Sequence, residues 1–383
     1  MRIVAISGNM TACYGYRLFW PLNTLHLEDP DNYTCTITNL VDERMISGRQ
    51  SNEGPADVLI LSREVHGPNL VAAANMRRDY GTRIIYDVDD YLFDLPPWNP
   101  VAKWFANDNI RSNIEHFLTH CDAITVSTEP LRRAYAKYNE HIYVLPNSIW
   151  PRVPSRVRNN RLPVVGWSGA VGHDMDFARA REALEELGRT GEAFVKLFSC
   201  EDFPAGPTVY NTPYVPWKGY YQTLAALDFD IGLVPLADHR FNLSKSNIRY
   251  LEYSMAGTPT IASAVGPFAT TIEHDQTGIL IEDDDDWLPW IRRLLKDPAH
   301  ADRLAAAARE DVLERFNISK NWKMWRRTMQ EVLARPPRKL RGSYVLAKTG
   351  LMVTTETPFV RVMAPTDPRP DRGTTVAAVD PGV

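Results

Sequence analysis

The sequence predicts an α/β protein with two parallel β-sheets, each covered by helices, and three observations support this fold class. Short apolar runs alternate with amphipathic helical stretches along most of the 383 residues, as in parallel sheets with helices on both faces. The alternation stops once, in a proline- and arginine-rich stretch between 150 and 163, and then restarts. A chain of this length also suggests two domains of ordinary size.

The first half contains six candidate strands separated by helical stretches. We expect residues 1–150 to form an N-terminal Rossmann-like domain and residues 151–163 to form a linker. The expected strands are Arg2–Ser7, Tyr33–Thr38, Asp57–Ser62, Arg83–Val88, Ala123–Ser127 and Ile142–Leu145, and the expected helices are Asn69–Tyr80, Lys103–Thr119 and Glu129–Asn139.

The second half repeats this alternation, so we expect a C-terminal Rossmann-like domain over 164–318. A helix over 319–335 should cross back to the N-terminal domain, and the tail 336–383 should be loosely ordered or peripherally packed. Two such domains would face each other across a cleft, where strand carboxyl ends usually bind ligands. The expected strands are Val164–Ser168, Phe194–Phe198, Phe229–Pro235, Thr258–Ser263 and Gly278–Ile281, and the expected helices are Met175–Leu187, Tyr220–Leu227, Asn247–Ala256, Asp286–Leu295, Pro298–Glu314 and Ser319–Leu333.

Composition narrows the function classes. Lysine and arginine number 43 against 47 acidic residues, which gives no support to general polyanion binding. The four cysteines form no Cys-x-x-Cys pair, so neither a zinc site nor a disulfide framework is indicated and a reducing compartment fits best. The N-terminal apolar run is too short for a signal peptide, and no stretch is long enough to span a bilayer. We expect a cytoplasmic protein, with peripheral contact at the inner membrane face left open.

The segment Ser244–Pro259 carries the most informative pattern. An apolar helical face begins at Ile248, and Glu252 lies on its flank, where a carboxylate needs a partner. Lys245, Arg249 and Glu252 fall along one stripe of that helix. One interpretation is a site for a phosphorylated sugar, in which the cation and helix-start amides hold phosphate and the carboxylate accepts from two hydroxyls. The other is a helix with an internal Lys/Arg–Glu pair.

Acidic residues follow the strand that ends near Val88. Asp87, Asp89 and Asp90 could hold a divalent cation, orient an acceptor hydroxyl or supply a base, or could cap a strand-end turn. We favour a functional role because the acids follow an apolar strand and precede aromatic residues at the expected cleft. A metal site is disfavoured because no second ligand cluster is apparent.

Aromatic and basic residues near the same expected cleft are further candidates for ligand contact. Tyr16 and Arg17 lie in a glycine-bearing segment after the first strand, where Arg17 is either a phosphate contact or a surface residue. The spacing of this segment does not match a dinucleotide fingerprint, so NAD and FAD are disfavoured. Trp98 could line an acceptor groove, rest on a lipid surface or pack in the core.

The corresponding loop of the second half contains three glycines. Gly169 lies in this loop, and glycine lets the backbone approach a phosphate or sugar. His173 follows and could hydrogen-bond a sugar or phosphate, or could be a solvated bystander. Lys218 is a further candidate phosphate contact.

These features together resemble the GT-B glycosyltransferases, specifically the large retaining family known as glycosyl transferases group one, or family four. The resemblance covers about residues 1–335. An Asp-Val-Asp-Asp segment and a Phe-Asn-x-Ser-Lys-Ser pattern also resemble a branch found among O-antigen-type and bacteriophage glycosyltransferases. The segments that carry the resemblance are Ala123–Leu131, Val144–Ile149, Asp228–Pro235, Leu251–Ser263 and Thr277–Ile281.

The resemblance implies roles for individual residues. In that family a Glu-x7-Glu pair grips the donor; Glu252 aligns with the second glutamate, which contacts the nucleotide ribose, and Ser244 replaces the first. Lys245 would then contact phosphate or sugar, and retention of the anomeric configuration is implied. The backbone that would cradle the diphosphate belongs to Ser246, Asn247 and Ile248.

Together, the residues and the resemblance predict a glycosyltransferase with a UDP- or GDP-sugar donor, no tightly bound cofactor and no required divalent cation. The acceptor is expected to be a glycan, a lipid-linked oligosaccharide or a protein, and near-neutral net charge disfavours nucleic acid. Two alternatives remain: a nucleotide-sugar epimerase or hydrolase, and a binding protein without turnover. The expected catalytic residues are Lys245, Asp89 and Asp90; the donor residues are Gly169, His173, Lys218, Ser244, Lys245, Ser246, Asn247, Ile248, Arg249 and Glu252; the acceptor residues are Tyr16, Arg17, Asp87, Asp89 and Trp98.

Overall fold

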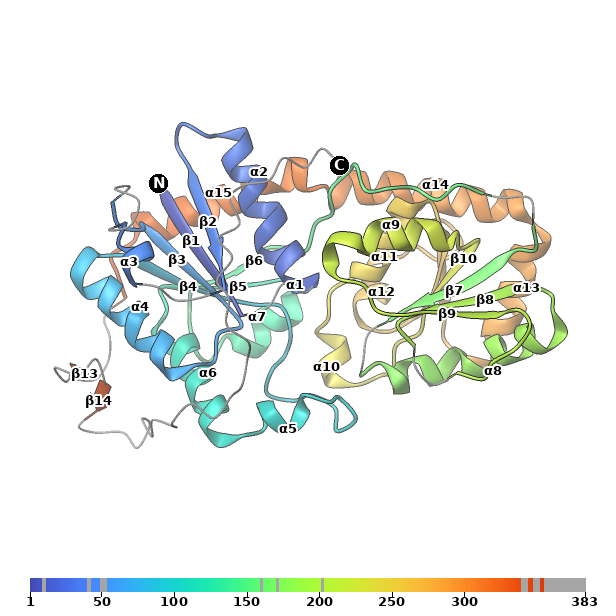
Figure 1. The fold of residues 1–383 in the computed structure, drawn as a ribbon, viewed down its shortest axis with the longest axis horizontal. Helices are drawn as coiled ribbons and strands as arrows, with labels where there is room; N and C mark the ends of the chain where they lie inside the picture. The colour runs from blue at the N-terminus through green and yellow to red at the C-terminus, as the bar shows by residue number, and fades with distance from the viewer. Residues whose placement is uncertain are drawn as a thin grey trace. The chain divides into compact units, whose positions relative to one another are not determined.

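The chain forms two compact units, each with its own six-stranded parallel sheet (Figure 1). The first unit comprises residues 1–93, 103–146 and 321–383, and the second comprises 94–102 and 147–320. The structure is a computed structural model. It describes residues 1–8, 12–39, 43–48, 54–158, 161–169, 172–200 and 203–338, and the backbone of 344–346 and 352–354.

The first sheet has the strand order β2-β1-β3-β4-β5-β6, so the chain reverses its direction of travel across the sheet between β1 and β3. Its strands are β1 (Arg2–Ser7), β2 (Thr34–Thr38), β3 (Val58–Ser62), β4 (Arg83–Val88), β5 (Ala123–Val126) and β6 (Ile142–Val144). The connecting elements are α1 (Ala12–Tyr14), η1 (Gly15–Phe19), α2 (Trp20–Glu28), α3 (Glu43–Ile46), α4 (Gly67–Tyr80), α5 (Ala102–Phe105), α6 (Asp108–His120) and α7 (Glu129–Tyr135). Two further strands, β13 (Tyr344–Leu346) and β14 (Met352–Thr354), form a two-stranded antiparallel sheet.

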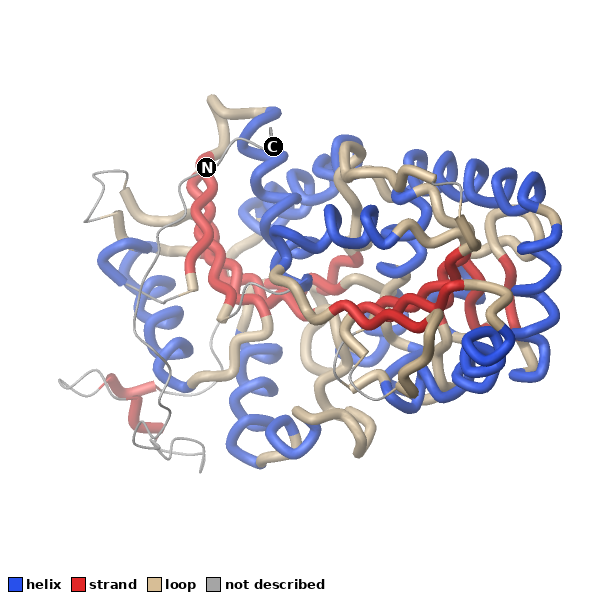
Figure 2. Tube along the Cα trace, turned by 45° about the vertical axis from the view of Figure 1, so that its right-hand side comes forward, coloured by secondary structure: helices blue, strands red, loops and turns tan. Residues whose placement is uncertain are grey.

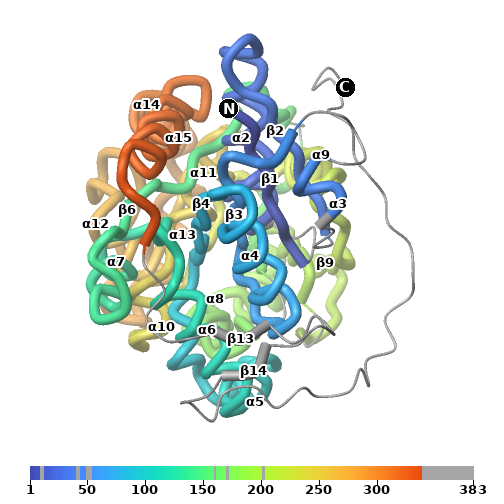
Figure 3. Tube along the Cα trace, turned by 90° about the vertical axis from the view of Figure 1, so that its left-hand side faces the viewer, coloured from blue at the N-terminus to red at the C-terminus, as the bar shows by residue number. Residues whose placement is uncertain are grey.

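Burial explains why the first sheet forms from apolar runs. Every residue of β1 and β3 is buried, as expected when helices cover both faces of a parallel sheet. Figure 3 shows α4 in front of β1, β3 and β4. This helix ends at Tyr80, and the next residue, Gly81, has a φ of 73°, the left-handed conformation of a helix C-cap.

The second sheet has the strand order β12-β11-β10-β7-β8-β9, and the chain reverses between β7 and β10. Its strands lie between layers of helices (Figure 2). The strands are β7 (Val164–Ser168), β8 (Phe194–Phe198), β9 (Val209–Thr212), β10 (Ile231–Val234), β11 (Thr260–Ser263) and β12 (Ile279–Ile281). The helices are α8 (Asp174–Thr190), α9 (Trp217–Leu227), α10 (Arg240–Leu243), α11 (Ile248–Ala256), α12 (Gly266–Thr271), η2 (Asp284–Asp286), α13 (Trp287–Lys296), α14 (Pro298–Arg315) and α15 (Ile318–Ala334).

The core of the second unit combines strand and helix residues on both sides of this sheet. Val165, Leu233 and Ile261 from the strands pack in one buried cluster with Leu184 of α8 and Trp287 of α13. The side chain of Trp287 is fully buried. A single apolar cluster of this size holds the sheet and its helices as one body.

The observed elements differ from the expected ones in several places. The helix expected over Lys103–Thr119 is two helices, because Asn107 caps α6 by accepting from the amide of Asn109 at 3.0 Å. Strand β9 was not expected, since its residues are half-buried or exposed. The helical run from Gly15 to Glu28 was also not expected.

Two segments belong to a different unit from the residues next to them in the sequence. Residues 94–102 belong to the second unit, although they lie within the first 150 residues. Helix α15 starts in the second unit, and its residues from Asn321 onward belong to the first. Within the first unit, Gln330 of this helix donates to the hydroxyl of Tyr33 at 3.1 Å. Among the described residues, we find no helix that combines the length and apolar character needed to cross a membrane.

Candidate functional site

The strongest candidate site of the second unit lies at the carboxyl edge of its sheet, where β7 and β10 are neighbours. The chain leaves these two strands in opposite directions, and ligands of open α/β sheets bind in the crevice at such a point. The segments that follow the two strands are 169–173 and 235–247. They carry His173 and Lys245.

His173 and Lys245 are half-buried and form part of a chain of polar contacts. The Nζ of Lys245 lies 3.4 Å from Nε2 of His173, and Nδ1 of His173 lies 2.7 Å from Oδ2 of Asp176. The Lys245 ammonium, followed by burial, lowers the pKa of His173. The imidazole is therefore neutral at physiological pH.

Asp176 ties the two segments together. Its side chain is only 4% exposed, and its Oδ1 accepts from the amide of Ala237 and from Nδ2 of Asn242, both at 2.8 Å. One carboxylate thus links the start of α8, the segment after β10 and helix α10. Such a fully bonded carboxylate holds its surroundings in one arrangement.

Lys245 is half-buried and stands at the turn before α11. Its ammonium lies 4.8 Å from the ring centroid of Phe241, a favourable cation–π distance. The side chain of Ser244, by contrast, is buried and donates to the carbonyl of Arg240 at 3.2 Å. Ser244 is the C-cap residue of α10.

The residues between Lys245 and α11 hold the helix start in place. Nδ2 of Asn147 donates to Oγ of Ser246 at 2.8 Å, and Nδ2 of Asn247 donates to Oγ1 of Thr271 at 3.4 Å. Helix α11 starts at Ile248. Its first-turn amides lack acceptors within the helix, and the helix dipole favours an anion there.

Glu252 lies one turn into α11 and is 1% exposed. Its Oε2 accepts from the Tyr220 hydroxyl at 2.8 Å and pairs with the guanidinium of Arg249. Burial opposes the charge on Arg249, but the Glu252 carboxylate and the neighbouring Tyr220 and Tyr253 hydroxyls together raise the pKa of Arg249. The internal Arg–Glu pair considered from the sequence is therefore present.

Tyr220 joins this pair to the end of β7. Its hydroxyl lies 2.9 Å from Oγ of Ser168, and its ring stacks on Phe198 at a centroid distance of 5.3 Å. Gly169 follows directly, and a Cβ added there would lie 1.9 Å from the ring of Trp167. Only glycine fits at that position. Lys218 is exposed in the first turn of α9.

Trp98 lies in the second unit beside these segments. Its ring meets that of His239 edge-on at a centroid distance of 5.6 Å. Two residues later, Pro100 Cδ would lie 2.9 Å from a Cβ added to Gly172. The expectation grouped Trp98 with the N-terminal acceptor residues, whereas the structure places it next to the segment that leads to Lys245.

Three of the expected acceptor residues lie in the interior of the first unit. Arg17 and Asp87 are fully buried and form an ion pair at 2.7 Å, and Thr125 donates to Asp87 at 2.7 Å. Tyr16 is 2% exposed and packs edge-on against Trp20. Their positions fit a role in holding the fold and give no support to direct contact with an acceptor.

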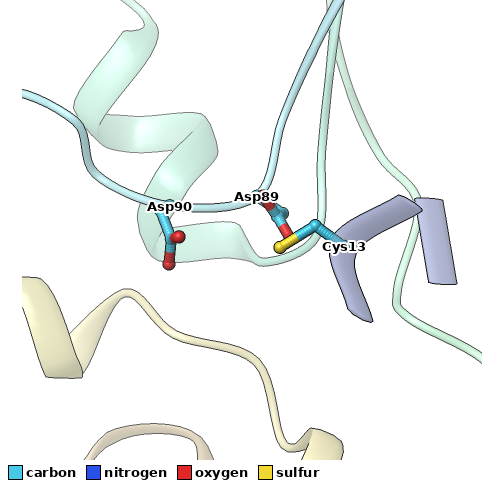
Figure 4. A group of neighbouring side chains, drawn as sticks. All are labelled: Cys13, Asp89 and Asp90. Carbon is cyan, nitrogen blue, oxygen red and sulfur yellow. The ribbon is translucent and has the colours of Figure 1, made fainter. Parts of the chain in front are cut away.

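Asp89 and Asp90 form a separate cluster with Cys13 and Arg63 at the carboxyl ends of β1, β3 and β4. Figure 4 shows the side chains of Asp89 and Cys13 directed toward one another, with Asp90 to one side. Nη1 of Arg63 lies 3.1 Å from Oδ2 of Asp90 and 3.6 Å from Oδ1 of Asp89. It also donates to Sγ of Cys13 at 3.3 Å.

This cluster offers two carboxylates and a thiol, which are possible ligands for a metal ion, and its carboxylates can also accept from hydroxyl groups. One ligand atom from each of Cys13, Asp89 and Asp90 lies within 4.8 Å of the others. Burial, followed by the Asp89 charge, raises the pKa of Cys13, so the thiol is protonated when no metal is bound. The Arg63 guanidinium already offsets part of the negative charge.

Several residues of these sites were not singled out from the sequence. Asp176 could have been found from its position three residues after His173 at a helix start, a spacing that brings side chains together. Tyr220, Arg63 and Cys13 offered no local signal. Their contacts join segments that are far apart along the chain.

Comparison with known proteins gives the same fold and a family for part of the chain. Residues 179–327 match a family described as glycosyl transferase-like. The D-inositol 3-phosphate glycosyltransferase of Nocardioides sp. (strain ATCC BAA-499 / JS614) is 30% identical over 153 residues, which cover 39% of this chain. The match spans only 30% of the length of that curated relative.

Two solved structures extend the similarity in fold to most of the chain. HepE of Anabaena, in complex with UDP and glucose, superposes with a TM-score of 0.61 at 12% identity, covering 86% of this chain and 100% of that one. An α-glucosyltransferase in complex with UDP and a 13-mer DNA containing an HMU base gives a TM-score of 0.61 at 12% identity, covering 86% and 99%. The two units therefore have the GT-B fold.

Proposed function

We propose that this chain, which has the GT-B fold and matches the glycosyl transferase-like family over residues 179–327, transfers a sugar from a nucleotide-sugar donor to a hydroxyl group. The observation that carries the proposal is the position of Lys245 and the α11 start at the carboxyl edge of the second sheet. A buried carboxylate, Glu252, follows one turn later.

The donor diphosphate would bind Lys245 and the first-turn amides of α11. Both favour negative charge, and the charge on the departing diphosphate grows as the sugar bond breaks. Groups aimed at that developing charge lower the barrier most when they are already held in place. The bonds of Asn147 to Ser246 and of Asn247 to Thr271 provide this support.

Glu252 would receive the nucleotide ribose. An ionised carboxylate has two oxygens and about four acceptor positions, so it can accept from ribose hydroxyls while Arg249 remains paired to it. The likeness to structures solved with UDP makes UDP the first nucleotide to test. Retention of configuration follows from the resemblance to the retaining family, and no divalent cation is required.

The cluster of Asp89 and Asp90 would hold the acceptor. Each carboxylate can accept from an acceptor hydroxyl, and Arg63 limits the repulsion between them. Candidate acceptors are a glycan, a lipid-linked oligosaccharide and a protein. DNA belongs in the test panel because one protein of this fold was solved with DNA.

The donor assignment is tested by isothermal titration of the protein with UDP, GDP and their glucose derivatives. We expect at least one of these to bind and Glu252→Ala to weaken binding at least about tenfold, because a hydrogen bond to a charged group contributes about 1.5–3 kcal/mol. Glu182→Ala is the control, since Glu182 is an exposed glutamate of α8. Absence of binding by all four nucleotides, or equal affinity in Glu252→Ala, would refute the assignment.

A second candidate is a binding protein without turnover, and the position of Ser244 favours it. The resembling family has a donor-contacting glutamate there, whereas Ser244 is buried against the Arg240 carbonyl. Mass spectrometry of donor and acceptor mixtures separates the possibilities. A glycosylated acceptor identifies a transferase, free sugar without acceptor a hydrolase, and nucleotide binding without any product the binding protein.

A further inference from the structure

The contact between Lys245 and His173 fixes which nitrogen of the imidazole carries the proton. A lysine ammonium can only donate, so Nε2 of His173 at 3.4 Å must be the acceptor. The proton of the neutral ring then sits on Nδ1, which faces Oδ2 of Asp176 at 2.7 Å. All three groups are satisfied in this arrangement and in no other protonation pattern with a charged lysine.

Asp176 is able to impose this arrangement because it cannot turn away. Its other oxygen accepts from the amide of Ala237 and from Asn242, and its side chain is 4% exposed. The carboxylate is therefore fixed from two directions, and the imidazole is aligned against a fixed acceptor. An aligned imidazole then presents its Nε2 lone pair to Lys245.

We infer that Asp176 and His173 are positioning residues that hold the Lys245 ammonium in place for an incoming diphosphate. The inference rests on the proposed donor site for what Lys245 binds. It assigns Asp176 and His173 a role in donor affinity through Lys245, and neither is required to touch the donor.

The charges around His173 make the arrangement depend on pH. The imidazole faces Lys245 from the turn before α11, Asp176 from α8 and Arg249 from α11. The two cations and burial lower the pKa of His173 more than Asp176 raises it. When pH falls far enough to protonate the ring, Nε2 becomes a donor and can no longer accept from Lys245.

The direct test is the tautomer of His173, read from long-range ¹H–¹⁵N correlation spectra of the wild-type protein without nucleotide. We expect a protonated Nδ1, an unprotonated Nε2 and a pKa below the ordinary histidine value. Lys245→Met should raise that pKa, because it removes the nearest positive charge. A proton on Nε2 in the neutral wild-type ring would overturn the inference.

Variants then connect the tautomer to affinity. In Asp176→Asn the amide oxygen is still needed by Ala237 and Asn242, so the amide NH2 group faces Nδ1 of His173. We therefore expect the imidazole proton to move to Nε2. UDP affinity should fall about tenfold, the effect of a displaced charge-assisted hydrogen bond. His173→Gln retains an acceptor for Lys245 and a donor for Asp176, so it should bind UDP nearly as the wild type does. His173→Leu retains neither and should bind about tenfold more weakly.

Asp174→Asn is the matched control, because Asp174 is an exposed aspartate in the same helical turn. Unchanged UDP affinity in both Asp176→Asn and His173→Leu, with folded spectra, would overturn the inference. If the wild type binds no nucleotide, the proposed donor site fails, but the tautomer spectra still decide how His173 and Asp176 hold Lys245. The two failures are therefore distinguishable.

Discussion

Arg17 and Asp87 are fully buried partners whose charges depend on each other. Thr125 donates to Asp87, and Arg17 also donates to the carbonyl of Leu145, so the pair connects η1 with β4, β5 and the end of β6. The indole of Trp325 in α15 lies 5.2 Å from the Arg17 guanidinium carbon. A buried pair of this kind constrains a fold because neither charge can exist there alone.

We therefore expect Asp87→Asn to lower the free energy of unfolding by about 3–5 kcal/mol, since it leaves Arg17 charged and buried. Urea unfolding followed by circular dichroism measures the change. Glu129→Gln is the control: it breaks an exposed pair with Arg132, and such pairs contribute about 0–1 kcal/mol. Equal losses in the two variants would show that burial does not govern this pair.

The sequence could reveal residues whose partners lie nearby in the chain, and could not reveal residues whose partners are distant. Arg249 and Glu252 were found because they share one stripe of α11, and helix geometry is local. Lys245 was found because its spacing continues that stripe, although the structure places it in the turn before the helix. Arg17 was expected to contact a ligand, because nothing local shows that its partner lies 70 residues away. Contacts between distant segments decide whether a charged residue is buried or available.

At the scale of elements, most strands of both sheets were predicted because apolar runs bounded by polar turns define strands buried on both faces. Strand β9 escaped because a partly exposed edge strand has no such run. The helical run formed by η1 and α2, from Gly15 to Glu28, escaped for a different reason. The glycine and aromatic residues at its start are typical of a loop, and tertiary packing of Tyr16, Leu18 and Trp20 overrides that preference.

Strand β7 is a place where element packing can be tested. A Cβ added at Gly166 would lie 2.2 Å from the buried ring of Phe229, so we expect Gly166→Ala to lower the free energy of unfolding by about 1–3 kcal/mol through overpacking. Thermal or urea unfolding measures this effect.

Gly219→Ala in α9 provides the control, because nothing lies within 4 Å of an added Cβ there. Alanine is the better helix former by about 1 kcal/mol, so this variant should be as stable as the wild type or more so. A loss of stability in Gly219→Ala similar to that in Gly166→Ala would mean that contact with Phe229 is not the cause.

At the scale of the whole molecule, each sheet has its own core and its own switch in strand order. The two-unit organisation was predictable because one proline- and arginine-rich stretch interrupts the alternation of strands and helices. The assignment of residues 94–102 to the second unit was not, since their neighbours His239 and Gly172 lie far along the chain.

The proposed donor site predicts where a nucleotide stabilises the molecule. With UDP at about 100 times its dissociation constant, the free energy of unfolding should rise by about 2.7 kcal/mol. Amide hydrogen exchange should slow in 164–169, 172–178 and 236–256. Exchange in β1 and β3 should not change. Protection of β1 and β3, with none over 236–256, would place the nucleotide in the first unit instead.

Residues 94–102 also affect how this protein can be recombined with its relatives. A chimera joined after residue 146 would combine Trp98 and Pro100 from one parent with His239 and Gly172 from the other. The steric match between Pro100 and a glycine of positive φ would then depend on both parents. Chimeras between homologues should therefore fold more often when residues 94–102 come from the same parent as 147–320.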